Sequence, residues 1–230
     1  MRVLSYNIRK AVGLDRRRNP ERVLRVIADS GADVALLQEA DRRLGARPAA
    51  IPKRLIELES DYDAVDLGAT DVSLGWHGNA VLVGPGLRVL GVRRLPLPGL
   101  EPRGAVLVEI EGARLGRVVL VGAHLGLLRR WRRRQMHALA EHVPQDDRGR
   151  TIIAGDFNEW APAGGFDPFG RAFRLVTPGR SFHAAYPVAP LDRFVHGAEL
   201  AVTASGVIRH GAARQASDHL PVWAEFAPAR

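Results

Sequence analysis

The feature that most constrains the fold is a series of short apolar segments without a helical period. Between residues 62 and 125 the chain reads YDAVDL, GNAVLVG, LRVLGV, GAVLVEIEG and RVVLVGAHL, separated by glycine and proline. Short runs rich in β-branched residues and bounded by turn residues are typical of strands. TIIAGDFN follows later, and LDRFVH, LAVTASGVI and SDHLPVWAEF close the chain. The sequence therefore predicts a protein built mainly on β-sheets.

Helical patterns occur at only a few places. NPERVLRVIADSG has Asn19 in the N-cap position, with proline in the first turn and glycine after the last. A shorter helix is expected over residues 51–58. A third is expected over residues 128–142, with Trp131 and Leu139 on its core-facing stripe. Many strands with a few helices among them predict two mixed β-sheets packed face to face, with helices outside, in an α/β architecture.

Composition excludes several kinds of site. The chain has no cysteine, which excludes disulfides, thiol nucleophiles and cysteine-based metal centres. Any metal must be held by oxygen or imidazole ligands, which favours magnesium, with manganese or calcium as alternatives. No linker or repeat interrupts the chain, so residues 1–230 are expected to form a single domain. No apolar run is long enough for a membrane span, and MRVLSYN begins directly as a strand, so a cytoplasmic location is expected.

The net charge of +8 favours an anionic partner. Almost all of the 33 basic residues are arginine, a skew that a GC-rich genome would also produce. Two runs, RKAVGLDRRR (9–18) and RRWRRR (129–134), concentrate the charge. Each is either a solvated face or part of a grip on an extended polyanion. Because both runs follow expected strands with polar ends, we expect both to border the cleft, including Arg129, Arg130 and Arg132.

Polar side chains recur at the ends of the expected strands. They are Asn7, Glu39, Asn79, His124, Asp156, Asn158, Asp192, Asp218 and His219. Any one of them alone is most simply a turn residue or a satisfied polar group. Together they lie where strands end and loops converge, which is where ligand sites are found. The pattern therefore predicts a site at one edge of the sheets.

The chemistry that this set can support is limited. Carboxylate oxygens of Glu39, Asp156 and Asp218 suit magnesium, which shares its coordination positions with water and substrate phosphate. Imidazoles and carboxamides hydrogen-bond phosphate oxygens or move protons. Metal-assisted attack of water on a phosphoester needs a cation, a carboxylate that activates water, and donors for the developing charge. The residues therefore favour a metal-dependent phosphoester hydrolase.

A set of short motifs, taken in order, resembles the endonuclease/exonuclease/phosphatase superfamily. The motifs are SYNIR, LLQEAD, GNAVL, PRGAVLVEI, AHLGL, GDFN, LDRF and SDHLPV, from Ser5 to Val222. That superfamily includes deoxyribonuclease-like nucleases, apurinic endonucleases, neutral sphingomyelinases and inositol polyphosphate 5-phosphatases. The resemblance implies a four-layer α/β sandwich whose active site lies at one edge.

The resemblance also implies roles for the metal and water groups. Glu39 is expected to be the principal metal ligand, with Asn7 beside it. Asp218 is expected near the metal, directly or through water. Asp156 is expected to polarise the attacking water, and Asn158 to hold a phosphate oxygen.

The same resemblance assigns the remaining polar residues. His219 is expected to donate to the phosphoryl group, with Asp192 accepting from its other ring nitrogen. His124 resembles the histidine that assists the leaving group in deoxyribonuclease-like members. Asn79, expected among the substrate-binding residues, stands where some nucleases have glutamate. Arg103 matches an arginine that either approaches phosphate or braces the sheet edge.

The motifs leave the substrate open. Glu159 and Trp160 follow GDFN where inositol polyphosphate 5-phosphatases have a Tyr-Arg pair, and PLDRF lacks their cysteine. YPVAPLDRF replaces the apurinic endonuclease pattern. We expect a monomeric phosphodiesterase acting on nucleic acid or on an anionic phospholipid head group. The alternative is a basic nucleic-acid- or lipid-binding protein that keeps the fold without catalysis. A pure binder has no need of Glu39, Asp156 and His219 together, which disfavours that alternative.

Overall fold

The strands of the computed structural model form two mixed six-stranded sheets. The structure describes residues 1–42, 45–67, 70–161 and 163–229. The first sheet has the order β11-β12-β1-β2-β4-β3 and the second has the order β5-β6-β7-β8-β10-β9. The strands of the first sheet are β1 (Arg2–Asn7), β2 (Val34–Gln38), β3 (Asp63–Ala64), β4 (Ala80–Val83), β11 (Leu200–Val207) and β12 (Val222–Pro228). Those of the second are β5 (Arg88–Pro96), β6 (Gly104–Gly112), β7 (Gly116–His124), β8 (Thr151–Asp156), β9 (Phe173–Val176) and β10 (Asp192–Gly197).

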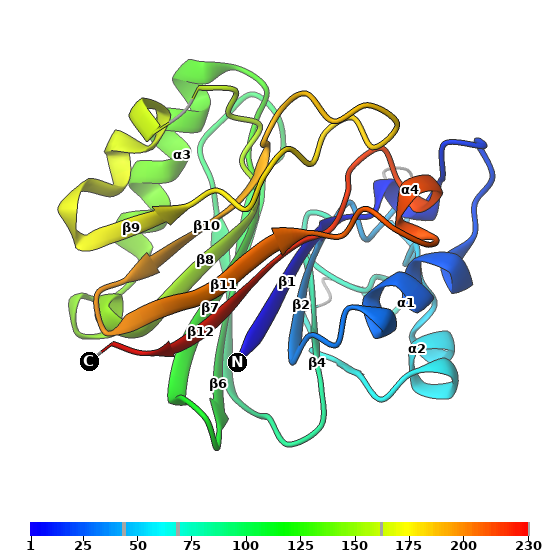
Figure 1. Cartoon of the computed structure of the whole chain (residues 1–230), viewed down its shortest axis with the longest axis horizontal. Helices are drawn as coiled ribbons and strands as arrows, with labels where there is room; N and C mark the ends of the chain where they lie inside the picture. The colour runs from blue at the N-terminus through cyan, green and yellow to red at the C-terminus, as the bar shows by residue number, and fades with distance from the viewer. Residues whose placement is uncertain (43–44, 68–69, 162, 230) are drawn as a thin grey trace.

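Three apolar cores hold four layers together. The two sheets face each other across the middle core, to which Leu36 and Leu120 contribute. Alternate side chains of a strand point to opposite faces, so Leu37 enters an outer core beneath helices α1 (Pro20–Asp29) and α2 (Lys53–Glu59). Val121 enters the other outer core, beneath α3 (Arg129–His142) and the 3-10 segment η3 (Ala163–Ala172). Figure 1 shows α3 on one side of the stacked sheets and α1 and α2 on the other.

This architecture confirms the predicted α/β sandwich of two facing sheets with helices outside. Helix α1 begins as expected, because the Asn19 side chain accepts a hydrogen bond from the Arg22 amide at 2.8 Å. The parallel pairs β1–β2 and β7–β8 bring their carboxyl ends to one edge of each sheet. In the described part of the chain, every helix is too short or too polar to cross a membrane.

Helix α3 differs from the expectation in which side chains it buries. Its buried positions are Arg132, Gln135, Met136 and Leu139, whose spacing defines one helical face. Trp131 lies off that face, is half-buried, and has the Arg130 and Arg134 guanidinium carbons 5.5 and 5.0 Å from its ring centroid. The expected core-facing position of Trp131 is therefore wrong.

Arg132 is part of the protein interior rather than of the surface. Its guanidinium lies 3.1 Å from the Glu159 carboxylate, with only 7% and 3% of the two side chains exposed, and it also donates to the Leu127 carbonyl. The expectation that Arg132 grips a polyanion is wrong, because the geometry of helix α3 turns it inward. The pair joins α3 to the segment that follows β8. Arg129 and Arg130, by contrast, are exposed.

We predict that Arg132→Ala lowers the free energy of unfolding by about 3–5 kcal/mol, because removing one partner of a buried ion pair leaves the other charge uncompensated. Urea denaturation measures the change. The matched control is Arg129→Ala in the same helix, which should change the free energy by less than about 0.5 kcal/mol because Arg129 is exposed. Equal effects of the two substitutions would contradict the structural role of Arg132.

Candidate active site

The two sheets meet at Asn7 and Asp156. Asn7 is the last residue of β1 in the first sheet, and Asp156 is the last residue of β8 in the second. The Asn7 Nδ2 atom donates to Asp156 Oδ2 at 3.0 Å. In the second sheet Asp156 is in register with His124 on β7 and with Asp192 on β10. Strand pairing thus brings polar residues from distant parts of the chain to one edge.

The Asp156 carboxylate lies at the centre of this group. The side chain is buried, and its Oδ1 accepts a hydrogen bond from the Asn158 amide at 2.9 Å. Its Oδ2 lies 3.5 Å from His124 Nε2 and 3.6 Å from His219 Nε2. One buried carboxylate therefore faces an imidazole on each of two sides, a geometry in which protons can be exchanged with a bound molecule.

His219 is oriented by a second buried carboxylate. His219 Nδ1 lies 2.8 Å from Asp192 Oδ2, which also accepts a hydrogen bond from the Ser181 hydroxyl at 2.6 Å. His219 lies in a loop before β12, where a continuous strand from Ser217 was expected. The Phe182 ring packs against the imidazole, with centroids 4.9 Å apart. These contacts leave Nε2 of His219 directed at Asp156.

The charges around His219 determine its protonation. Burial alone would lower the pKa of the imidazole, but the carboxylates of Asp192 and then Asp156 outweigh burial and raise this pKa to about 10, with a smaller contribution from Asp218. The ring is therefore a cation at neutral pH. Because both nitrogens of an imidazolium are donors, His219 can donate from Nε2 while Asp192 holds Nδ1.

Two further carboxylates lie beside this group. Glu39 follows β2 directly, has a left-handed backbone (φ 53°), and contacts the Lys10 ammonium. Asp218 lies 3.3 Å from the Arg9 guanidinium. Glu39 and Asp218 line one cavity of about 330 Å³ together with Asn7 and Asp156. The start of the first arginine run therefore borders the site as expected, and its cations neutralise the site's own carboxylates.

Two sets of side chains could hold a metal ion. Asp156, Asp192 and His219 offer ligand atoms within 4.8 Å of one another. A cation there would have to displace the proton of His219, because metal-binding imidazole must be deprotonated. Glu39 and Asp218 need no such loss, and their hard oxygens in a shared cavity suit magnesium. The positive groups beside both carboxylates indicate that these positions attract a cation.

The other sequence-predicted residues lie at different depths. Asn158 lines the cavity, and its side-chain Nδ2 donates to the Leu125 carbonyl at 2.9 Å. Arg103 also lines the cavity and is paired with Glu101 at 2.7 Å. Asn79 is fully buried, donates to the Gly104 carbonyl at 2.9 Å, and is not among the residues that line the cavity. Its contact with substrate stays a prediction.

The segment after Asn158 is anchored by the buried side chain of Arg193. Arg193, next to Asp192, is buried and donates to the carbonyls of Glu159 at 3.0 Å and Ala161 at 2.8 Å. Burial lowers the pKa of this guanidinium to about 10, against the opposing effect of the Glu159 carboxylate. The anchored segment carries Trp160, which lines the cavity with 60% of its surface exposed.

Several residues of the site were not predicted from the sequence. Ser181 and Phe182 belong to a loop without a recognisable motif, so no signal in the sequence marks them, whereas Leu127 ends the AHLGL motif. Lys10 could have been found, because it is the only lysine in the first basic run and follows Asn7 closely. Trp160 was noted only as a departure from another pattern, although it adjoins GDFN.

The model of the Endonuclease/Exonuclease/phosphatase family matches residues 4–219, which include all the residues of this site. The chain belongs to the endonuclease/exonuclease/phosphatase family. Members of this family are phosphoester hydrolases, so the chain has the fold of a hydrolase. The match confirms the family that the sequence motifs indicated. No curated protein matches the chain.

Solved structures of family members share the whole fold. An endonuclease/exonuclease/phosphatase from Beutenbergia cavernae is 23% identical with a TM-score of 0.76, covering 100% of this chain and 72% of that one. The mannosyl-6-phosphatase of Bacteroides thetaiotaomicron is 18% identical, with a TM-score of 0.75 and 99% of both chains covered. TDP2 of D. rerio, complexed with a single-strand DNA product, is 16% identical, with a TM-score of 0.74 and 98% of both chains covered.

We predict that Asp192→Asn lowers the pKa of His219, because it removes the carboxylate that most favours the charged ring. Imidazole nitrogen shifts followed by NMR through a pH titration of the metal-free protein measure this pKa. Asp218→Asn should lower it less, since Asp218 makes the smallest contribution. The account of the pair is wrong if Asp192→Asn leaves the pKa unchanged, or if Asp218→Asn has the larger effect.

Proposed function

We propose that this family member is a divalent-metal-dependent phosphodiester hydrolase, which acts by attack of water on phosphorus. The observation that carries the proposal is the position of Asp156. Its carboxylate lies between the imidazoles of His124 and His219 and in one cavity with Glu39 and Asp218. That combination places a proton acceptor, donors for anionic oxygen and cation-binding oxygens around one cavity of about 330 Å³.

Glu39 and Asp218 are the residues that would hold the metal, with Asn7 beside them. Their carboxylates suit magnesium, and manganese or calcium would accept the same oxygen ligands. A divalent cation held by these residues would supply Lewis acidity to polarise a phosphoryl oxygen of the substrate. On metal binding, the Lys10 ammonium and the Arg9 guanidinium must leave the two carboxylates or share them.

Asp156 is suited to take the proton of the attacking water. Its Oδ1 is held by the Asn158 amide, and its Oδ2 is held by Asn7 Nδ2. These two bonds fix the direction of the carboxylate, because each of its oxygens is held by a separate donor. A fixed general base within reach of a water contributes on the order of 10²–10⁴ to the rate.

The two histidines serve opposite sides of the phosphoryl group in this mechanism. His219 is charged at neutral pH and donates from Nε2 to an oxygen that gains charge, while Asp192 accepts from Nδ1 and fixes the orientation of the ring. His124 lies on the other side of Asp156, where it can transfer a proton to the leaving oxygen. Asn158 and Arg103 line the same cavity and contribute further donors to the phosphate.

Phosphodiesters of nucleic acid or of a phospholipid head group remain the proposed substrates. Support for nucleic acid comes from the exposed Trp160 ring at the cavity, 6.4 Å from the Phe182 ring, which offers a surface for base stacking. A structural neighbour, TDP2 of D. rerio, holds a single-strand DNA product. A non-catalytic binding protein is the weaker alternative, because binding alone requires no charged His219–Asp192 pair aimed at Asp156.

We predict that Glu39→Gln reduces hydrolysis of bis(p-nitrophenyl) phosphate at limiting magnesium by on the order of 10²-fold, since even groups that only support metal ligands are worth about 10–100-fold. The substitution keeps the size and removes the charge that holds the cation. The initial rate against magnesium concentration measures the effect, and circular dichroism should be unchanged.

The matched control is Glu57→Gln, an exposed residue of helix α2, which should leave the magnesium dependence unaltered. Full activity of Glu39→Gln would refute the assignment of the metal ligand. Undiminished activity of the wild-type protein in excess chelator would refute metal dependence itself.

A further inference from the structure

A second cavity adjoins the catalytic cavity, and the proposed mechanism does not use it. Its volume is about 340 Å³. Glu39, Arg103 and His124 line both cavities, so a ligand bound at Asp156 can extend past these three side chains into the second space. Beyond them the charged and imidazole side chains that line the second cavity are Lys10, Asp41, Arg42, Arg47, His77 and Glu101.

The carboxylates around the second cavity are already engaged. Asp41 accepts hydrogen bonds from the Leu74 amide at 2.7 Å and from the Gly75 amide, so its oxygens are turned into a loop. Glu101 is held by Arg103 at 2.7 Å, and Glu39 contacts Lys10. No partner of this kind remains for the other cations.

Among the described residues, Arg42 and Arg47 therefore have no ion-paired carboxylate, although the Asp41 carboxylate lies near enough for its charge to interact with Arg47. Among the residues that the structure describes, no carboxylate lies within ion-pair distance of either guanidinium. An excess of arginine over free carboxylates favours a bound anion, because arginine binds phosphate through paired, charge-assisted hydrogen bonds.

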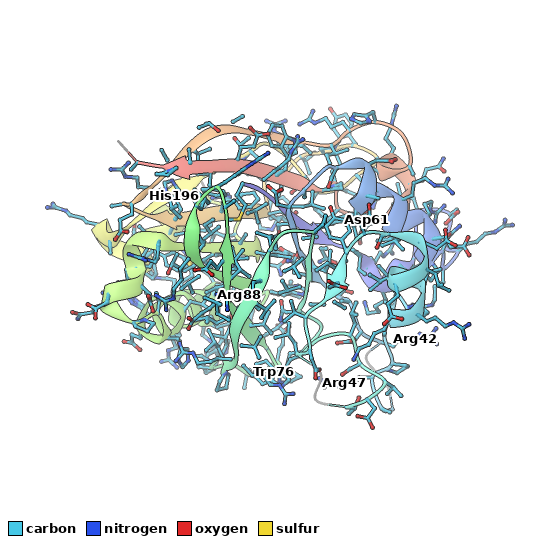
Figure 2. All side chains as sticks on the ribbon, turned by 90° about the horizontal axis from the view of Figure 1, so that it is seen from below. Arg42, Arg47, Asp61, Trp76, Arg88 and His196 are labelled. Carbon is cyan, nitrogen blue, oxygen red and sulfur yellow. The ribbon has the colours of Figure 1, made fainter. Side chains whose placement is uncertain are left out.

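Arg47 is also held in place. Its Nη1 atom lies 3.4 Å from His77 Nδ1, and burial together with Arg47 lowers the pKa of this imidazole, so the neutral ring can accept from the guanidinium. His77 packs edge-on against Trp76, with centroids 4.3 Å apart. Figure 2 shows Arg42, Arg47 and Trp76 along one edge of the molecule.

The backbone beside this cavity is strained where its side chains are placed. Arg47 and His77 have left-handed backbones, with φ of 53° and 48°, as does Glu39 on the shared wall. Non-glycine residues in this region cost roughly 1–3 kcal/mol each and persist where the surroundings hold them, often at ligand sites. The backbone conformations that place these side chains around the cavity therefore lower the stability of the folded protein.

We propose that the second cavity binds a second phosphate group of the same substrate molecule, with Arg42 and Arg47 as its ligands. The inference rests on the proposed function, in which the scissile phosphate occupies the catalytic cavity. It narrows the substrate class to molecules with another phosphate near the reacting one. Such a group is the next phosphate of an oligonucleotide or the second phosphate of a small bisphosphate, and both present the same chemistry to the arginines.

Calorimetric binding to the Asp156→Asn variant, with magnesium present and no turnover, tests the proposal. Two ligand pairs differ by one phosphate: the dinucleotide pTpT against TpT, and glucose 1,6-bisphosphate against glucose 6-phosphate. The added phosphate should tighten binding by about tenfold or more in at least one pair, the worth of one charge-assisted hydrogen bond. A gain with pTpT identifies a nucleic-acid source, and a gain with the sugar identifies a small bisphosphate.

Arg42→Ala and Arg47→Ala should each remove most of that gain. Arg88→Ala, at a residue labelled in Figure 2, is the matched control and should keep the gain. Arg88 is an exposed arginine of β5 that is paired with Glu111 and lines neither cavity. No gain in either pair would overturn the proposal. A gain that survives both alanine substitutions would overturn it as well.

Turnover of bis(p-nitrophenyl) phosphate, which has one phosphate, separates this inference from the proposed function. Arg42→Ala and Arg47→Ala in the otherwise wild-type protein should leave its kcat and KM within about twofold, since a small diester reaches only the catalytic cavity. If the wild-type protein is inactive but the added phosphate still tightens binding through Arg42 and Arg47, the proposed catalysis is refuted and the second site is not. An active protein without the gain would refute only the second site.

Discussion

The hydrogen bond from Asn7 to Asp156 is the contact on which the site depends, because it joins the carboxyl end of β1 in one sheet to that of β8 in the other. The facing sheets are held mainly by apolar packing, which has no direction. A polar bond between their buried ends sets the alignment of the two edges. Everything else at the site is placed relative to Asp156, which faces both His124 and His219.

Buried charge at this edge is balanced within the protein by neighbours of opposite sign. Asp192 is compensated by the charged His219, and Glu39 and Asp218 are compensated by Lys10 and Arg9. Removing carboxylates from water is costly unless each finds such a partner. The partners differ in what they allow. An imidazolium can release its proton during a reaction, whereas ammonium and guanidinium groups can give way to a metal ion of higher charge.

Much of the fold and the site could be predicted from the sequence, because apolar strands that end in polar residues leave a clear local pattern. Asn7, His124 and Asp156 were predicted at strand ends, and strand pairing brings them together. The phase of helix α3 could not be predicted, since shifting its buried face by one residue exchanges Trp131 for Arg132. Non-local contacts and the cavity formed by separate loops leave no such periodic signal.

The account's central claim is that the Asp156 carboxylate activates water rather than binding the metal or only supporting the fold. The most direct test compares Asp156→Asn with the wild-type protein in two measurements, kcat for bis(p-nitrophenyl) phosphate and magnesium affinity by calorimetry. We predict that kcat falls by on the order of 10²–10⁴, while magnesium binds within a few-fold of its wild-type affinity. Retained kcat, or a loss that excess magnesium restores, would contradict the claim.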